Sequence, residues 1–354
     1  MSTKTNQNDN KGDGQSETGD IFSDKILSPG ETNKVPALQQ LALLGVLMFL
    51  LFSGAITPKV IGLFTEKQDT TPAAVAYPET QPELIPVDAE LKIKPFSEVQ
   101  IVGKTAYVWD VQGQRALYEK ESNKQVPLAS VTKLMTALVA SELLEETASI
   151  AINRQAIQQD GDSGLLSGET FNRQSLTDLV LMSSSNDGAY AMAAAAGEIL
   201  QTNNGPNAFV HAMNIRAKEL KLHDTYFKNP TGLDLSPQEG GAYGSAKDMA
   251  FLMEFIVLNE SDLLTFTQEN EAHVYSEDGI YHDAENTNYY IDEIPGLIGS
   301  KTGYTDLAGG NLVIAFDAGL NRPIIIAVLG STRHERFTDV IALVKEAQNY
   351  ISQE

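Results

Sequence analysis

The sequence PLASVTKLMTALVA, residues 127–140, joins a serine and a lysine to the start of an apolar helix. Apolar residues recur at helical spacing after Lys133, so we predict a helix that begins near Ser130. Because residues three apart on a helix share a face, Lys133 can point at Ser130 within the first turn. A serine hydroxyl needs a nearby base to become a nucleophile, and a lysine whose pKa is lowered can be that base. The alternative for this pair is an ordinary helix N-cap followed by a solvated lysine.

Two further short motifs could complete a site of the same chemistry. Ser184-Ser185-Asn186 falls where an apolar helical pattern breaks, so a hydroxyl there could relay a proton and an amide could hold a peptide. Lys301-Thr302-Gly303 precedes the β-rich run from Asn311, which predicts an edge strand. Such an edge can bind an extended peptide, with Lys301 and Thr302 on its carboxylate. The alternatives are a polar turn between helices and a strand that ends in a turn.

The order of the three motifs is more informative than any one of them. The patterns S-x-x-K, S-x-N and K-T-G each occur once in the chain, in the order found in penicillin-binding proteins and class A β-lactamases. Lys301 would also supply the second cation that lowers the pKa of Lys133. One active site explains all three motifs together, whereas the structural alternatives are independent of one another.

The rest of the globular region predicts helices packed on a sheet. Residues 105–110 and 115–118 flank Gly113 and are typical of a hairpin. Ser175 and Asp178 resemble a capping box that opens a helix ending at Met182. Residues 311–316 and 323–329 are expected to be adjacent antiparallel strands, and a last helix carries an apolar stripe. This order predicts an α/β protein, α+β in the broad sense, with an antiparallel sheet.

The region from residue 98 to residue 354 resembles the D-alanyl-D-alanine carboxypeptidases, the low-molecular-mass penicillin-binding proteins. The resemblance rests on the three motifs and on the segments around them. These are PLASVTKLMTALVA (127–140), LTDLVLMSSSNDGAYAMA (176–193), NPTGLD (229–234), GSAKDMAFL (244–252) and GSKTGYTDLAGGNLV (299–313). It implies a β-lactamase/transpeptidase-like fold, with a helical lobe beside the sheet and the site in the groove between them.

The resemblance also implies a role for each motif residue. Ser130 would be the acylated nucleophile, Lys133 its base, and Ser184 the residue that passes on the proton. The substrate would be held by Asn186, Lys301, Thr302, Gly303 and Tyr304, with the backbone N–H groups of Ser130 and Tyr304 forming the oxyanion hole. Either Arg333 or Arg336 would add attraction for the carboxylate. The implied substrate is a peptidoglycan stem peptide, the implied covalent inhibitors are β-lactams, and no metal or cofactor is implied.

The sequence departs from this family in two respects. Ser185 stands in the middle of the S-x-N motif, where glycine is common. Many relatives carry a second, β-rich domain and an amphipathic C-terminal anchor, and we expect neither after the final helix of this sequence. An N-terminal membrane span would replace that anchor.

The N-terminal third predicts how the catalytic domain is attached. Residues 1–34 are polar and are expected to form a disordered cytoplasmic tail. Residues 35–58 carry no charge and are long enough for a transmembrane helix, for which a cleaved signal peptide is the alternative. Residues 59–97 form a Pro-rich linker and residues 98–354 the extracytoplasmic catalytic domain of a cell-membrane protein.

Composition and missing motifs exclude several other classes. The net charge of −22 excludes a nucleic-acid partner, and the absence of cysteine excludes disulfides and thiolate metal sites. The chain lacks the E-x-x-L-N pattern of class A β-lactamases, the G-x-S-x-G of Ser-His-Asp hydrolases and the H-E-x-x-H of zinc peptidases. A D,D-endopeptidase and a penicillin-binding sensor without turnover remain as alternatives, because motifs report the reaction and not the size of the substrate.

Overall fold

The computed structural model describes residues 95–161, 163–200 and 204–354. The chain divides into the units Met1–Leu91 and Lys92–Glu354, and every described residue lies in the second. The predicted tail, the predicted transmembrane helix and linker residues 59–94 therefore lie outside the described residues. Within the described ranges, no helix is both long and apolar enough to cross a bilayer.

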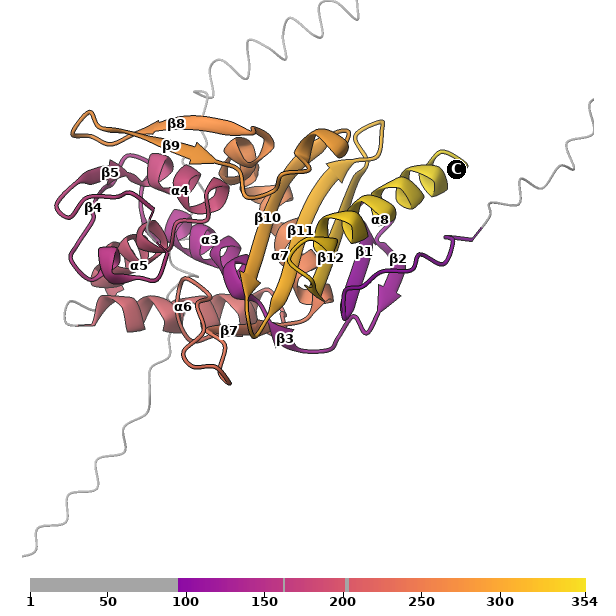
Figure 1. Cartoon of the computed structure of the whole chain (residues 1–354), viewed down its shortest axis with the longest axis horizontal. Coiled ribbons are helices and arrows are strands. Elements are labelled where there is room, and N and C mark those ends of the chain that lie inside the picture. The colour runs from indigo at the N-terminus through magenta and orange to yellow at the C-terminus, as the bar shows by residue number, and fades with distance from the viewer. Residues whose placement is uncertain (1–94, 162, 201–203) are drawn as a thin grey trace, which may run out of the picture. The chain divides into compact units, whose positions relative to one another are not determined.

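A five-stranded antiparallel sheet forms the centre of the described domain, in the order β10-β11-β12-β1-β2 (Figure 1). Its strands are β1 (Thr105–Asp110), β2 (Arg115–Lys120), β10 (Leu297–Thr305), β11 (Gly309–Asp317) and β12 (Pro323–Ser331). The predicted β1–β2 hairpin and the predicted pairing of β11 with β12 are confirmed. The prediction that the K-T-G motif lies on an edge strand is also confirmed, because β10 ends the sheet.

The sheet is covered on both faces by helices. α8 (Glu335–Ile351) lies across one face, where Ala106 and Val108 join Val340 in one buried apolar core. α7 (Ala246–Asn259) lies on the other face, where the ring of Phe251 meets Trp109 edge-on at 5.2 Å. Successive side chains of a strand point to opposite faces, so two-sided burial requires the nearly continuous apolar runs seen in β11 and β12.

A helical lobe lies beside the β10 side of the sheet (Figure 1). It contains α3 (Lys133–Leu143), α4 (Arg173–Met182), α5 (Asn186–Leu200) and α6 (Gly205–Glu219), and smaller sheets pack around it. Their strands are β3 (Val126–Pro127), β4 (Ser149–Ala151), β5 (Thr170–Asn172), β6 (Tyr226–Phe227), β7 (Ala242–Gly244), β8 (Glu271–Tyr275) and β9 (Tyr281–Glu285). Short 3₁₀ helices span Ala129–Thr132, Ala156–Gln158, Ser261–Gln268 and Ile291–Glu293. The predicted α/β fold, with helices packed on an antiparallel sheet, is confirmed.

The predicted capping box at the start of α4 is wrong. The helix begins at Arg173, and the side chain of Asn172 accepts a hydrogen bond of 2.7 Å from the backbone N–H of Ser175. Asp178 instead accepts from the Gln174 side chain one turn earlier. Asparagine is as good an N-cap as serine, and it here occupies the position three residues before Ser175.

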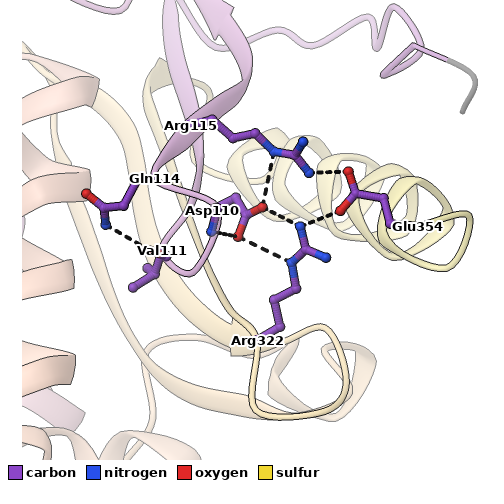
Figure 2. Close-up of polar contacts among 7 residues, drawn as sticks. Asp110, Val111, Gln114, Arg115, Arg322 and Glu354 are labelled. Atoms are coloured by element: carbon purple, nitrogen blue, oxygen red, sulfur yellow. Dashed lines mark hydrogen bonds and ion pairs between the residues drawn. The ribbon is translucent and has the colours of Figure 1, made fainter.

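A buried carboxylate ties the far edge of the sheet together (Figure 2). Asp110, at the end of β1, accepts hydrogen bonds from the Arg322 guanidinium at 2.6 and 3.3 Å and from Arg115 at 3.3 Å. Both arginines also pair with the side chain of Glu354. Although burial alone would raise its pKa, hydrogen bonds from Arg322 and from Gly113 N–H hold the pKa of Asp110 below its ordinary value.

Asp110→Asn is expected to lower the free energy of unfolding by about 3 kcal/mol at pH 7, because it leaves two arginines facing a neutral group. Since the pKa of Asp110 is lowered by folding, its stabilisation is fully present above the unfolded value of about 3.9 and is lost as pH falls further. Urea denaturation at several pH values measures the difference. Glu121→Gln, which removes an exposed ion pair with Lys124, is the control and should change stability by less than about 0.5 kcal/mol. Equal effects of the two variants would contradict the prediction.

Candidate active site

Ser130 lies in a 3₁₀ turn, Ala129–Thr132, immediately before α3. The predicted helix therefore begins three residues later than expected, at Lys133. Asn311 of β11 fastens the turn to the sheet: its Nδ2 donates to the carbonyls of Pro127 and Leu128 at 3.0 and 2.9 Å, and its Oδ1 accepts from Gly330 N–H. These bonds hold the serine at a fixed place against the strands.

The Lys133 amine lies fully buried between three oxygen atoms. Its Nζ is 2.8 Å from Ser130 Oγ, 2.6 Å from Asn186 Oδ1 and 3.0 Å from the Thr231 carbonyl oxygen. Burial, followed by the charge of Lys301, lowers the pKa of Lys133 well below its ordinary value. A neutral amine has two N–H donors and one lone pair. The carbonyl of Thr231 and the amide oxygen of Asn186 can only accept, so the lone pair is left for the hydroxyl proton of Ser130.

The orientation of the Asn186 side chain is fixed at both ends. Its Oδ1 faces Lys133, and its Nδ2 donates a 2.6 Å hydrogen bond to the Asp160 carbonyl. Since a carbonyl cannot donate, the nitrogen must face Asp160. Asn186 also lines the cavity.

Ser184 and Lys301 form a second hydroxyl–amine pair. Ser184 lies in the turn between α4 and α5 with a φ of 64°, a conformation that costs energy for a residue with a Cβ. Its Oγ accepts a 3.0 Å hydrogen bond from Lys301 Nζ, which also donates to the Thr302 carbonyl at 3.1 Å. Burial, followed by the charge of Arg336, lowers the pKa of Lys301 to about 7.

Strand β10 passes unusually close to the serine turn at Gly303. A Cβ added to Gly303 would lie 2.8 Å from the Leu128 carbonyl oxygen and 3.1 Å from Ser130 N. Both contacts are backbone atoms, which cannot move aside cheaply. A glycine is therefore required for the backbone of β10 to lie against the backbone of Ser130.

A cavity of about 290 Å³ opens beside these groups. Ser130, Ser184, Asn186, Thr302, Gly303 and Tyr304 line it together with Thr287, Tyr289, Tyr290, Arg333, His334, Arg336 and Phe337. Lys301, predicted with Thr302 to hold the carboxylate, has its buried amine engaged by Ser184 and by the Thr302 carbonyl.

Both candidate arginines reach the cavity, but their surroundings differ. Arg336 is buried, donates to the Gly303 carbonyl at 2.7 Å, and has a buried Nε without a partner. Burial, followed by the charge of Arg333, lowers the pKa of Arg336 to about 10. Arg333 lies over the Tyr304 ring at 5.1 Å. Arg336 is thus the arginine whose guanidinium is fixed by a hydrogen bond to the strand that carries the K-T-G motif.

The sequence motifs predicted neither Asn311 nor residues 286–290 as part of the site. Asn311 looked like the first residue of an ordinary strand, and no motif marks 286–290. The alternation of asparagine with threonine and tyrosine in Asn286–Tyr290 was the only local signal, since buried asparagines normally hold backbone groups.

The fold and this arrangement define a serine peptidase. A hydroxyl nucleophile, a buried amine beside it and a second hydroxyl–amine pair converge at the edge of a helix-covered antiparallel sheet, and this supports acyl transfer.

Comparison with known proteins identifies the family. Residues 92–333 match the Peptidase_S11 family, D-alanyl-D-alanine carboxypeptidase, and the chain belongs to this family. It is 32% identical over 257 residues to the D-alanyl-D-alanine carboxypeptidase DacF of Bacillus subtilis, covering 71% of this chain and 63% of the relative. It is 31% identical to a D-alanyl-D-alanine endopeptidase of Pseudomonas aeruginosa, covering 69% of this chain and 76% of that protein. The structure of penicillin-binding protein D2 from Listeria monocytogenes in its ampicillin-bound form matches with a TM-score of 0.58 at 26% identity, covering 71% and 98% of the two chains.

Proposed function

We propose that this protein is a serine-type D-Ala-D-Ala carboxypeptidase that removes the terminal D-alanine of peptidoglycan stem peptides through an acyl-enzyme on Ser130. The observation that carries the proposal is the fully buried Lys133 amine, 2.8 Å from Ser130 Oγ, with its other two neighbours both obligate acceptors. This arrangement favours a neutral amine that can accept the hydroxyl proton at neutral pH.

Acylation begins when the Ser130 hydroxyl passes its proton to Lys133 Nζ and its Oγ attacks the carbonyl carbon of the penultimate D-alanine. The carbonyl oxygen becomes an oxyanion, for which the backbone N–H groups of Ser130 and Tyr304 are the proposed donors. Support for this pairing comes from the close approach of β10 to Ser130 N at Gly303. Two donors held by strand and turn geometry need no rearrangement when the charge develops.

Collapse of the tetrahedral intermediate requires a proton on the leaving amine. Ser184 lines the cavity and its hydroxyl is bonded to Lys301 Nζ, so Ser184 is proposed to donate that proton and to recover one from Lys301. A pKa of about 7 suits Lys301 to this exchange at neutral pH. The C–N bond breaks and D-alanine leaves, with the proton from Ser130 on Lys133 and Lys301 short of the proton it gave to Ser184. Return of this proton from Lys133 to Lys301 through solvent restores both amines. A water molecule then attacks the ester, Lys133 takes the proton of the water, and it returns that proton to Ser130 Oγ as the acid product leaves.

The cationic end of the cavity is proposed to bind the terminal carboxylate. Arg336, held by its hydrogen bond to the Gly303 carbonyl, and Thr302 are the proposed contacts, since both residues line the cavity. Asn186 would donate its free N–H to the acyl-side amide, and the peptide would extend along the exposed edge of β10. Lys301 acts in this scheme through Ser184 and not on the carboxylate.

The test is analysis of products from a pentapeptide ending in D-Ala-D-Ala and from a cross-linked muropeptide dimer. Repeated release of D-alanine from the pentapeptide, lost in Ser130→Ala, is the expected result. Cleavage of the dimer alone would support a D,D-endopeptidase, the activity for which the Pseudomonas relative is named. A single burst without turnover would support a sensor instead.

We also propose covalent inhibition by β-lactams and attachment to the cell membrane. The first is supported by the ampicillin-bound form of the Listeria neighbour, and the second by the 24 uncharged residues 35–58, since about 20 residues cross a bilayer core. Because stem peptides lie outside the cytoplasmic membrane, the catalytic domain would face outward. Cell fractionation with external protease treatment tests this: a domain protected in intact cells would overturn the proposed orientation.

A further inference from the structure

The segment Asn286–Tyr290 is a prebuilt wall of the cavity that none of the sequence motifs contains. Asn286 Nδ2 donates to the carbonyls of Thr267 and Glu269 at 2.9 and 2.8 Å, and its Oδ1 accepts from Asn288 N–H. Asn288 in turn bonds Ser300 Oγ at 3.2 Å. With both asparagines buried and engaged, the alternate residues Thr287 and Tyr289 line the cavity.

Thr287 connects the K-T-G strand with the end of α4. The hydroxyl of Thr302 donates to Thr287 Oγ1 at 2.6 Å, and the hydroxyl of Thr287 donates to the Met182 carbonyl at a longer 3.3 Å. The backbone N–H of Thr287 bonds the same carbonyl at 3.2 Å. Met182 precedes the turn that holds Ser184, so the chain of hydroxyls joins two sides of the site.

We infer that Thr287 is a positioning residue that enables Thr302 to recognise the substrate's terminal carboxylate; this rests on the proposed function. In the free protein the Thr302 hydrogen is directed at Thr287, so Thr302 Oγ1 presents lone pairs to the cavity. A carboxylate accepts hydrogen bonds and does not donate them. Thr302 must therefore turn its hydrogen toward the carboxylate, and its bond to Thr287 must reverse direction.

Thr287 is suited to this reversal because its own hydrogen makes the weakest bond of the chain. Rotation of the Thr287 hydroxyl gives up the 3.3 Å bond to Met182 and donates to Thr302 instead. The Met182 carbonyl keeps its bond to the Thr287 N–H. The Thr287 hydroxyl then donates to Thr302, and the Thr302 hydroxyl donates to the carboxylate. A hydroxyl that accepts one hydrogen bond donates a stronger one. Each proton stays on its own oxygen atom, and only the direction of the hydrogen bonds changes.

Thr287→Val keeps the branched shape and removes the hydroxyl, so it isolates this contribution. The kcat/KM for a peptide ending in D-Ala-D-Ala should fall about tenfold, equivalent to about 1.4 kcal/mol, mainly through KM. The kcat/KM for the same peptide ending in D-Ala-D-alaninamide, which lacks the carboxylate, should change less than about twofold. Thr287→Ser should restore most of the preference for the acid.

Thr267→Val is the matched control, because the Thr267 hydroxyl supports the same strand by accepting from Ser300 N–H at 3.1 Å and is not part of the cavity. It should leave unchanged the ratio of kcat/KM for the acid peptide to kcat/KM for the amide peptide.

An unchanged ratio in Thr287→Val, or an equal loss on both substrates, overturns the inference. If the wild-type protein releases no D-alanine, that result contradicts the proposed function and does not decide the role of Thr287. Thr287 is then judged by acylation with penicillin, which also carries a carboxylate: a tenfold slower rate supports the inference, and an unchanged rate overturns it.

Discussion

Replacing Lys133 by methionine is expected to slow acylation of Ser130 by penicillin about a thousandfold, within the range that a positioned general base contributes. Methionine fills a similar volume in the buried site. The variant therefore keeps the packing and removes the proton acceptor. Without the amine, Ser130 Oγ loses the base that lies 2.8 Å from it, while the carbonyl of Thr231 and the amide oxygen of Asn186 cannot take its proton. Stopped-flow measurement of the acylation rate constant and of the dissociation constant for the non-covalent complex separates chemistry from binding.

The control for this variant is Lys345→Met, which removes an exposed lysine of α8 and should leave both constants unchanged. Non-covalent binding to Lys133→Met is expected to stay within a few fold of wild type, because the lysine does not line the cavity. Acylation near the wild-type rate would show that another group takes the proton. Loss of non-covalent binding would show instead that the lysine supports the shape of the site.

Local patterns predicted the parts of this site that depend on short spacing. The turn-length separation of Ser130 and Lys133 follows from helical geometry, although a 3₁₀ turn replaces the expected first turn of the helix. The edge position of Lys301 followed from the β-rich runs behind it. The antiparallel pairing of β11 with β12 likewise followed from two β-rich runs close together in the sequence.

The features that were missed depend on contacts between distant parts of the chain. Asn311 holds the serine turn across 183 residues, and Asp160 orients the amide of Asn186 across 26. No propensity or periodicity reports such bonds. The N-cap of α4 was predicted wrongly for a different reason. Asn172 and Ser175 are both acceptable N-cap residues and lie three positions apart. Only the end of the preceding strand decides which of them caps the helix.

Gly303→Ala is expected to reduce the acylation rate by about 10²- to 10³-fold, as much as the removal of an oxyanion-hole donor costs. The added methyl group would stand 2.8 Å from the Leu128 carbonyl oxygen and 3.1 Å from the N atoms of Ser130 and Val131. Backbone atoms cannot rotate away as a side chain can, so β10 must move outward from the serine turn. The N–H of Tyr304 would move with it, away from the position of the developing oxyanion.

The effect of Gly303→Ala should be almost entirely on the chemical step. The Ser130–Lys133 pair lies on the serine-turn side of the contact between β10 and that turn. It is held by Asn311 and Thr231, so Ser130 keeps its base. Gly279→Ala, placed in open space at the β8–β9 turn with a φ of 78°, is the control for the general cost of a glycine substitution. It should lower the thermal midpoint slightly and leave acylation unchanged. If Gly303→Ala were acylated as fast as this control, the close approach of β10 to Ser130 would have no part in stabilising the transition state. The proposed pairing of the Ser130 and Tyr304 N–H groups would then be wrong.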